Sequence, residues 1–213
     1  MGEIKKGILG GFRGTVGTVV GSTYRGKSII RSRPTASHKP PTEEQLLQRK
    51  KFRLVIKFLN PLQGIQSQLF GSRAGVKSRV NLAVSYTLRE AVKVVNGEPE
   101  LLFNKVLITK GELSGFKNPQ VTLQAGGVVT CSWEDNSGQA TAAEDDVFGS
   151  AIYCPELNEF VLTDGIAMRA ELTAEQVVPD SFTGKQVQVY LWFRNAAGKI
   201  ACTSLYMGEM MIL

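Results

Sequence analysis

One stretch of the sequence has the residue types and spacing of a phosphate-binding loop. Residues 21–28, GSTYRGKS, match the pattern G-x-x-x-x-G-K-[ST], and Asp164 ends an apolar run as a magnesium-binding aspartate would. That chemistry needs a helix beginning at Lys27 and Ser28, so that its amide groups face the phosphates. Pro34 interrupts any such helix within two turns and disfavours helical backbone in the residue before it. We therefore expect no nucleotide site and no bound cofactor.

The remaining titratable residues do not form a catalytic set. His38, the single histidine, lies in a Pro-rich linker, where it has no nucleophile beside it in the sequence. Four acidic residues between positions 135 and 146 lack the spacing of an EF-hand and are expected in a solvated loop; they are Asp135, Glu144, Asp145 and Asp146. We expect no catalytic residue, no enzymatic activity and no small-molecule substrate.

The cysteines are expected to be buried thiols. Cys131, Cys154 and Cys202 are an odd number, and no two of them are close in the sequence. A disulfide between Cys131 and Cys202 with one spare thiol is the alternative. Because no C-x-x-C pair exists and only one histidine is present, we expect no zinc site and no other metal.

Charge is distributed unevenly along the 213 residues. Residues 1–57 hold thirteen of the 25 Lys and Arg residues but only three of the 19 acidic ones, whereas the net charge of the whole chain is +6. This asymmetry indicates a basic N-terminal part that meets an anionic partner, or the acidic half of a neighbouring copy. No apolar run approaches the roughly 18 residues of a membrane helix. We expect no membrane span, no cleavable signal peptide, and a location in the cytoplasm or in an assembled particle.

The first 33 residues favour a strand-forming arm. They hold eight glycines and seven basic residues against one acid, with strands expected over residues 12–20 and 27–33 and a turn over 21–26. Glycine in a strand lets another backbone approach closely, and an exposed edge is open to pairing. The residues that we expect to contact a partner are Gly10, Gly11, Phe12, Arg13, Gly14, Val16, Gly17, Val19, Tyr24, Arg25, Lys27, Arg31 and Arg33.

Helices are expected to follow the linker over residues 34–41. The first runs from Glu43 to about Leu59, behind a capping box formed by Thr42 and Gln45. Its apolar face is expected to hold Phe52, Val55, Ile56 and Leu59, widened by Leu47, Leu54 and Phe58. Its basic face, a candidate polyanion contact, holds Arg49, Lys50, Arg53 and Lys57. Two further helices are expected from Pro61 to about Phe70 and over about 77–93, the latter ended by Asn96-Gly97.

From residue 103 the apolar pattern changes to the period of strands. The expected strands are Lys105–Thr109, Gln120–Leu123, Val128–Trp133, Val147–Tyr153, Glu159–Thr163, Met168–Leu172, Gln186–Arg194 and Ile200–Tyr206. Short strands at close spacing favour an antiparallel sandwich of immunoglobulin or fibronectin-III type, with Trp133, Tyr190 and Trp192 in its core. The fold class is therefore α+β. Its expected parts are an arm and linker (1–41), a helical region (42–103) and a β-sandwich (104–213), whose apolar tail, residues 210–213, is expected to dock.

Several blocks resemble an uncharacterised family of similar length found mainly in Bacteroidota. The blocks are Ile4-Lys5-x-Gly7-Ile8-Leu9-Gly10-Gly11-Phe12, Gly14-x-Val16-Gly17-x-Val19-Val20-Gly21, Arg31-Ser32-x-Pro34, Pro41-Thr42-x-x-Gln45-x-x-x-Arg49-x-x-Phe52, Lys105-Val106-Leu107-Ile108-x-Lys110-Gly111-x-Leu113 and Ser204-x-Tyr206-x-Gly208. That family implies no activity. The N-terminal pattern is also similar to blocks in small phage and prophage proteins, which implies a component of a virion, tail or other assembly.

These observations lead to a non-enzymatic structural protein as the main hypothesis. Its arm would add strands to a neighbouring copy or to a larger particle. The alternative is a nucleic-acid-binding protein that uses the basic arm and the basic helix face. A third hypothesis is an adhesive or ligand-binding sandwich.

Overall fold

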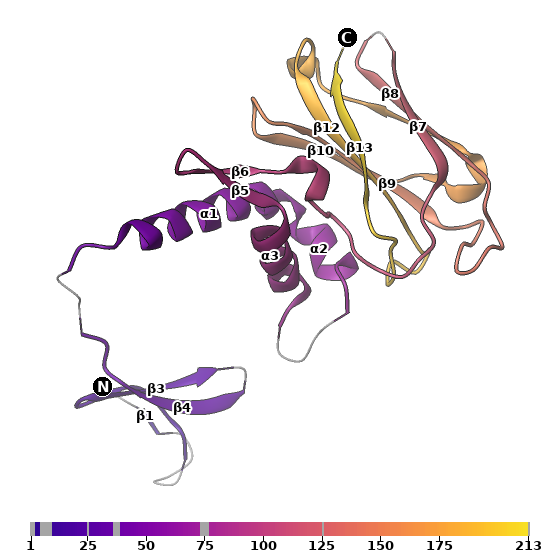
Figure 1. The fold of residues 1–213 in the computed structure, drawn as a ribbon. Helices are drawn as coiled ribbons and strands as arrows, with labels where there is room; N and C mark the ends of the chain where they lie inside the picture. The colour runs from indigo at the N-terminus through magenta and orange to yellow at the C-terminus, as the bar shows by residue number, and fades with distance from the viewer. Residues whose placement is uncertain are drawn as a thin grey trace. The chain divides into compact units, whose positions relative to one another are not determined.

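A computed structural model describes residues 3–4, 10–24, 26–35, 39–72, 77–124 and 126–212. The chain divides into two compact units, which we call the arm unit (Met1–Glu43) and the main unit (Glu44–Leu213). The main unit contains both the region predicted as helical and the region predicted as a sandwich (Figure 1).

The arm unit is an antiparallel sheet of four strands in the order β1-β2-β3-β4. The strands are β1 (Glu3–Ile4), β2 (Phe12–Val16), β3 (Val19–Tyr24) and β4 (Lys27–Ser32). The strand expected over 12–20 is wrong in its extent, because Gly17 turns the chain with a φ of 56° and starts a new strand. The turn expected over 21–26 is likewise shorter, since β3 continues to Tyr24.

Two glycines of the arm allow the close approach that their spacing predicts. A Cβ atom on Gly21 would overlap the carbonyl and the ring of Phe12, and a Cβ atom on Gly11 would overlap the side chain of Ser28. Phe12 therefore packs onto the flat backbone at Gly21.

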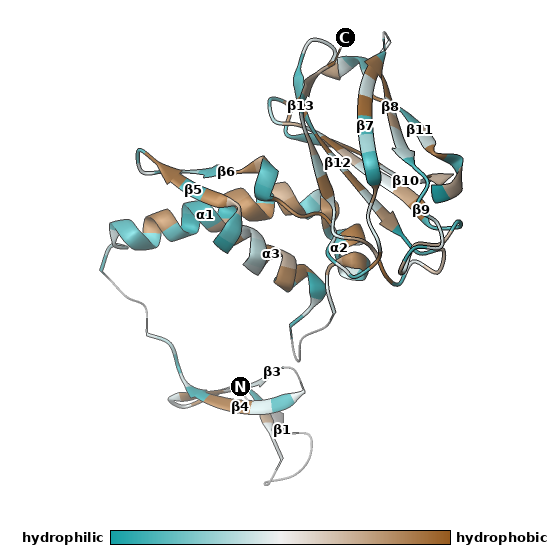
Figure 2. Ribbon diagram, turned by 45° about the vertical axis from the view of Figure 1, so that its right-hand side comes forward, coloured by the Kyte–Doolittle hydropathy of each residue, from teal (hydrophilic) through white to brown (hydrophobic). Residues whose placement is uncertain are grey.

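The main unit begins with helices close to those expected. They are α1 (Glu43–Leu59), the 3₁₀ turn η1 (Asn60–Leu62), α2 (Gln63–Leu69) and α3 (Arg79–Glu90). The hydropathy colouring along α1 alternates between hydrophobic and hydrophilic, as expected for an amphipathic helix (Figure 2).

The buried face of α1 differs from the expected one by a rotation about the helix axis. Val55, Phe58 and Leu59 are buried, but Phe52, which was expected beside them, is 50% exposed. The helical period allows either arrangement, and contacts with the sheet select the face that carries Phe58. Its ring lies 4.9 Å from that of Tyr153 and 5.1 Å from that of Phe160, measured between centroids.

A hairpin of β5 (Val92–Val95) and β6 (Glu98–Leu101) replaces the end of the third expected helix. Asn96 and Gly97 join the strands with positive φ angles of 51° and 82°. An Asn-Gly pair between strand-forming residues favours a two-residue hairpin turn, because both positions need positive φ. The pair was interpreted as a helix stop, and that was wrong.

Seven further strands form two antiparallel sheets. The strands are β7 (Lys117–Gln124), β8 (Val128–Glu134), β9 (Val147–Cys154), β10 (Glu159–Met168), β11 (Thr173–Val177), β12 (Gln186–Arg194) and β13 (Leu205–Met211). One sheet has the order β10-β9-β12-β13 and the other has the order β11-β8-β7. Short 3₁₀ turns connect them at η2 (Phe103–Lys105), η3 (Arg169–Glu171) and η4 (Asp180–Phe182).

The four-stranded sheet is covered on both faces. On one face, Phe148 of β9 stacks on Trp133 of β8 at 5.2 Å, and Phe193 meets the same indole edge-on at 5.4 Å. On the other face, Tyr153 contacts Phe58 of α1, and the Tyr190 hydroxyl donates to the Phe103 carbonyl. Burial on both faces explains why β12 is apolar almost without interruption.

The expected core residues Trp133, Tyr190 and Trp192 are confirmed as buried. A Cβ atom on Gly149 of β9 would overlap the indole of Trp192, so this glycine makes room for the ring. The three cysteines are free thiols and buried. In the tail, Met210 and Met211 end β13, and Ile212 is buried.

Three of the expected strands are wrong in place or type. Lys105 ends η2, and residues 106–109 belong to neither sheet; the Ile108 amide donates instead to the Ser204 hydroxyl, and the Thr109 hydroxyl donates to the Cys202 carbonyl. Residues 168–172 form the end of β10 and η3, and β11 follows them. The last strand begins only at Leu205, because the segment before it contacts residues 109–113. None of the helices in the described ranges is long and apolar enough to cross a membrane.

Candidate functional site

The arm sheet exposes apolar side chains that an isolated domain would bury. All six residues of β4 are exposed, and Ile30 is 64% exposed. Within the described residues of the arm unit, Gly21 alone is buried. The hydrophobic centre of β4 lies between hydrophilic ends (Figure 2). The described part of the arm therefore has no apolar core of its own.

Strand register divides the arm side chains between two faces. Directly opposite residues of paired strands point to the same side of a sheet, and alternate residues share a face. The pairs Gly14–Gly21, Gly21–Ile30 and Val16–Val19 therefore lie on one face. We call it the apolar face, formed by Phe12, Gly14, Val16, Val19, Gly21 and Ile30, with Thr23, Ser28 and Ser32 on the same side.

The opposite face of the arm gathers its positive charge. Arg31 pairs with Val20 and Lys27 pairs with Tyr24, so these residues share a side with Ile29. We call this the cationic face, formed by Thr15, Val20, Ser22, Tyr24, Lys27, Ile29 and Arg31. The structure thus brings together two of the basic residues that the sequence marked, Lys27 and Arg31, beside the exposed Tyr24.

The other predicted contact residues have different places. Gly10 and Gly11 precede β2, Gly17 makes the first turn, and Arg33 follows β4, where its amide donates to the Thr18 carbonyl at 2.7 Å. Arg25 and His38 lie outside the described residues. Phe12 is half-buried against Gly21, so Tyr24 is the aromatic ring that the arm exposes.

The structure supports the rejection of the phosphate-binding loop. Lys27 and Ser28 begin strand β4 and pair with Tyr24 and Thr23. No helix begins there to direct its amides at a phosphate. Asp164 accepts two hydrogen bonds from the Arg194 side chain, at 2.8 and 2.9 Å.

A second basic surface lies along α1. Arg49, Arg53 and Lys57 follow one another at intervals of four residues, and together with the exposed Phe52 and the half-buried Ile56 they line one shallow surface. Lys50 does not belong to it, because its ammonium group pairs with Glu98 of β6. Three of the four predicted basic residues are therefore brought together around an exposed aromatic ring.

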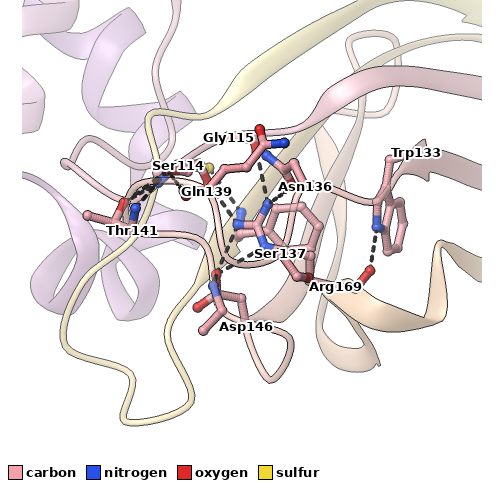
Figure 3. Close-up of polar contacts among 12 residues, drawn as sticks. Ser114, Gly115, Trp133, Asn136, Ser137, Gln139, Thr141, Asp146 and Arg169 are labelled. Atoms are coloured by element: carbon pink, nitrogen blue, oxygen red, sulfur yellow. Dashed lines mark hydrogen bonds and ion pairs between the residues drawn. The ribbon is translucent and has the colours of Figure 1, made fainter.

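The acidic cluster contains a buried ion pair, which corrects the expectation of a solvated loop. The Asp146 carboxylate is 1% exposed and lies 3.0 Å from both Nε and Nη2 of Arg169, which is fully buried (Figure 3). Asp135 does stay exposed, and the hydrogen bond from the Ser137 amide lowers the pKa of its carboxyl below the ordinary value.

Arg169 joins two loops to the sheets. Its Nη1 donates to the Gly115 carbonyl at 3.0 Å and to Oδ1 of Asn136 at 2.6 Å, and its Nη2 donates to the Ser114 carbonyl at 2.8 Å (Figure 3). Its own carbonyl accepts from the Trp133 indole at 2.8 Å, and its guanidinium lies 4.0 Å from the ring centroid of Phe193. Because the pair is enclosed, its role is structural. Sequence reasoning missed Arg169, which has no local signal that separates it from a surface arginine.

In the described part of the chain, no group of three or more His, Cys, Asp or Glu side chains is arranged to hold a metal ion. Burial raises the pKa of the Cys131 thiol to about 12 and that of Cys202 to about 11, so neither is an activated nucleophile. Among the described residues, the features that stand out are thus two exposed surfaces, one on the arm sheet and one along α1.

Comparison with known proteins places the chain in a family. A model of a family of unknown function, DUF6266, matches residues 11–208, and the chain belongs to that family. No curated protein matches it. Among solved structures, the fn3 domain of human contactin 1 is similar, with 7% identity over 49% of this chain and 83% of that chain. Its TM-score of 0.33 supports no inference about function.

Proposed function

We propose that this protein is a non-enzymatic structural protein that associates with further copies of itself, or with a larger particle, through its arm. The carrying observation is the apolar face of the arm sheet. It holds Val16 and Ile30, which are 50% and 64% exposed, in a unit whose described residues enclose no apolar side chain. A small sheet with one uncovered apolar face needs a second layer for stability.

The energetic gain from covering that face is appreciable. Completing the burial of a half-exposed Val or Ile side chain contributes about 1–1.5 kcal/mol. In a symmetric pair each copy contributes the same patch, so the gain is doubled. Strand β4 adds a second mode of contact. It pairs with β3 alone in the described structure, so its outer edge has backbone groups available for strand addition.

The uneven distribution of charge along the chain supports the proposal that the partner is a second copy of this protein. The basic excess lies within residues 1–57, and the remainder of the chain holds sixteen of the 19 acidic residues. The basic arm of one copy would therefore be attracted to residues 58–213 of another copy, which hold twelve basic and sixteen acidic residues. In such an assembly the two facing sheets of the main unit, which we interpret as a sandwich of immunoglobulin or fibronectin-III type, would project or pack laterally. The resemblance to small phage proteins agrees with this role, in the cytoplasm or in a particle.

The test compares two adjacent isoleucines of β4. Ile30 lies on the apolar face and Ile29 on the cationic face, so Ile30→Glu should dissociate the assembly while the matched variant Ile29→Glu should weaken it less. Analytical ultracentrifugation of the full chain at micromolar concentration measures the outcome, together with a variant lacking residues 1–41. An intact chain that is monomeric, or an oligomer of unchanged size after deletion of the arm, would contradict the proposal.

The second candidate function is nucleic-acid binding, and the exposed Phe52 among three cations of α1 favours it. Phosphate contacts from Arg and Lys with an aromatic ring for stacking are the elements of single-strand recognition. Fluorescence anisotropy with a labelled oligonucleotide should show affinity that falls steeply with salt. Each of Arg53→Gln and Lys57→Gln should reduce the slope of log affinity against log salt by about 1. Binding that is absent, or insensitive to salt, would exclude this function.

A further inference from the structure

A cleft in the main unit has the features of a ligand site that neither the arm nor the basic surface of α1 involves. It lies between α2 and α3 on one side and residues 110–112 and 199–203 on the other, with a volume of about 540 Å³. That volume is within the range of small-molecule pockets, which is roughly 300–1,000 Å³.

Positive charge exceeds negative charge around this cleft. Its lining includes Arg79, Arg89, Lys110 and Lys199, against the single carboxylate of Glu112. None of these four cations forms an ion pair with an acidic side chain in the described ranges. Like charges gathered around a concavity focus a positive potential into it, which raises the local concentration of anions.

The lining of the cleft also includes aromatic and aliphatic side chains, which a ligand's apolar part would contact. Tyr86 and Leu82 of α3 line it together with Ile200, which is half exposed. The Lys110 ammonium lies 5.2 Å from the ring centroid of Tyr86, which holds this charge beside the aromatic surface. A ligand is therefore offered both charge and apolar contact.

Backbone contacts hold the walls in place. Phe70 and Lys110 form a parallel bridge, in which the Gly71 amide donates to the Lys110 carbonyl at 2.6 Å and the Lys110 amide donates to the Leu69 carbonyl at 3.1 Å. A Cβ atom on Gly111 would overlap the carbonyl of Ala201, so the two segments meet backbone to backbone. A site whose walls are preformed loses little conformational entropy when it binds a ligand.

We propose that this cleft binds a small organic anion that carries at least two negative charges, as phosphate or carboxylate groups, on an apolar or aromatic body. Arginine binds either group through two parallel hydrogen bonds, and lysine adds a point charge. The inference goes beyond the proposed assembly role and replaces the expectation that the protein takes no small molecule. It does not depend on the arm.

Isothermal titration of the full chain tests the proposal, with pyrophosphate, citrate and ATP as probes at matched ionic strength. Saturable binding of at least one probe is expected. Binding of pyrophosphate or ATP alone identifies a phosphate ligand, and binding of citrate alone identifies a carboxylate. A hydrogen bond from a charged donor contributes about 1.5–3 kcal/mol to the free energy of binding. Arg79→Gln and Lys110→Gln should therefore each weaken the affinity for the probe about tenfold or more.

Two further variants keep the test decisive. Lys105→Gln, at an exposed lysine outside the cleft, is the matched control and should leave the affinity unchanged. Lys199→Gln lies in an exposed turn, so it tests the cleft without disturbing the core. The proposal is overturned if no probe saturates, if Lys105→Gln weakens binding as much as Lys110→Gln, or if Lys199→Gln and Lys110→Gln together leave the affinity intact.

Discussion

The buried ion pair of Asp146 and Arg169 yields a prediction whose size follows from the structure. Asp146→Asn removes the carboxylate charge and keeps the shape of the side chain. Arg169 then stays buried and charged, with neutral groups as its remaining acceptors: Asn136, Gly115 and Ser114. Breaking a buried pair by removing one partner costs about 3–5 kcal/mol, because the other charge is left uncompensated.

The chain contains a matched control for this substitution. Arg194 and Asp164 also form a short ion pair, but their side chains are 20% and 41% exposed, whereas those of Arg169 and Asp146 are 0% and 1% exposed. Water solvates the charge that Asp164→Asn leaves behind, so we expect a loss below about 1 kcal/mol. The same chemical change should therefore destabilise the protein several times more at position 146 than at position 164.

Urea unfolding followed by tryptophan fluorescence measures both variants. Trp133 and Trp192 are the two tryptophans of the sequence, and both lie in the main unit, so the signal reports that unit. If the loss of unfolding free energy arises because the Arg169 charge is buried without a partner, Asp146→Asn should cause a much smaller loss in a protein that already carries Arg169→Met. Equal losses at positions 146 and 164, or an undiminished loss in that background, would refute the reasoning.

Two further predictions concern packing and the buried thiols. Gly149→Ala should destabilise the protein by about 1–3 kcal/mol in the same unfolding assay, because its methyl group meets the Trp192 indole, whereas Gly64→Ala, with open space at its Cβ position, should not destabilise it. Cys131 and Cys202 should not react with a thiol reagent at pH 8 until the chain unfolds. Their pKa values are raised from an ordinary 9.0 to about 12 and about 11, so above pH 9 the unfolded state releases protons that the folded state keeps. Stability should fall from pH 9 towards pH 11–12, and a flat profile there would contradict this.

Local chemistry was enough to predict much of the fold. Helix α1 begins at Glu43 directly after the predicted cap at Thr42 and ends at Leu59 before Asn60-Pro61, as expected. Strand β12 spans Gln186–Arg194 as predicted, because a long apolar run with β-branched and aromatic residues has few alternatives. The glycines at the turns of the arm were also informative, since a positive φ is a property of single residues.

The sequence did not predict whether a residue is buried when its neighbours in the fold come from distant segments of the chain. Phe52 and Phe58 lie on the same helix and have the same local preference, yet one is exposed and the other is buried against Tyr153 and Phe160 of the sheet. Arg169 is buried because loops from residues 114–115 and 136–146 surround its guanidinium.

By itself, then, the sequence determined the basic glycine-rich arm, the order of helices before sheets in the main unit, and the aromatic core of those sheets, since composition and period depend on neighbouring residues alone. The tertiary structure alone decided which face of the arm is apolar, which acidic residue is buried, and where four cations from three segments surround one cleft. These features depend on contacts between residues that are far apart in the chain, and no local pattern encodes such contacts.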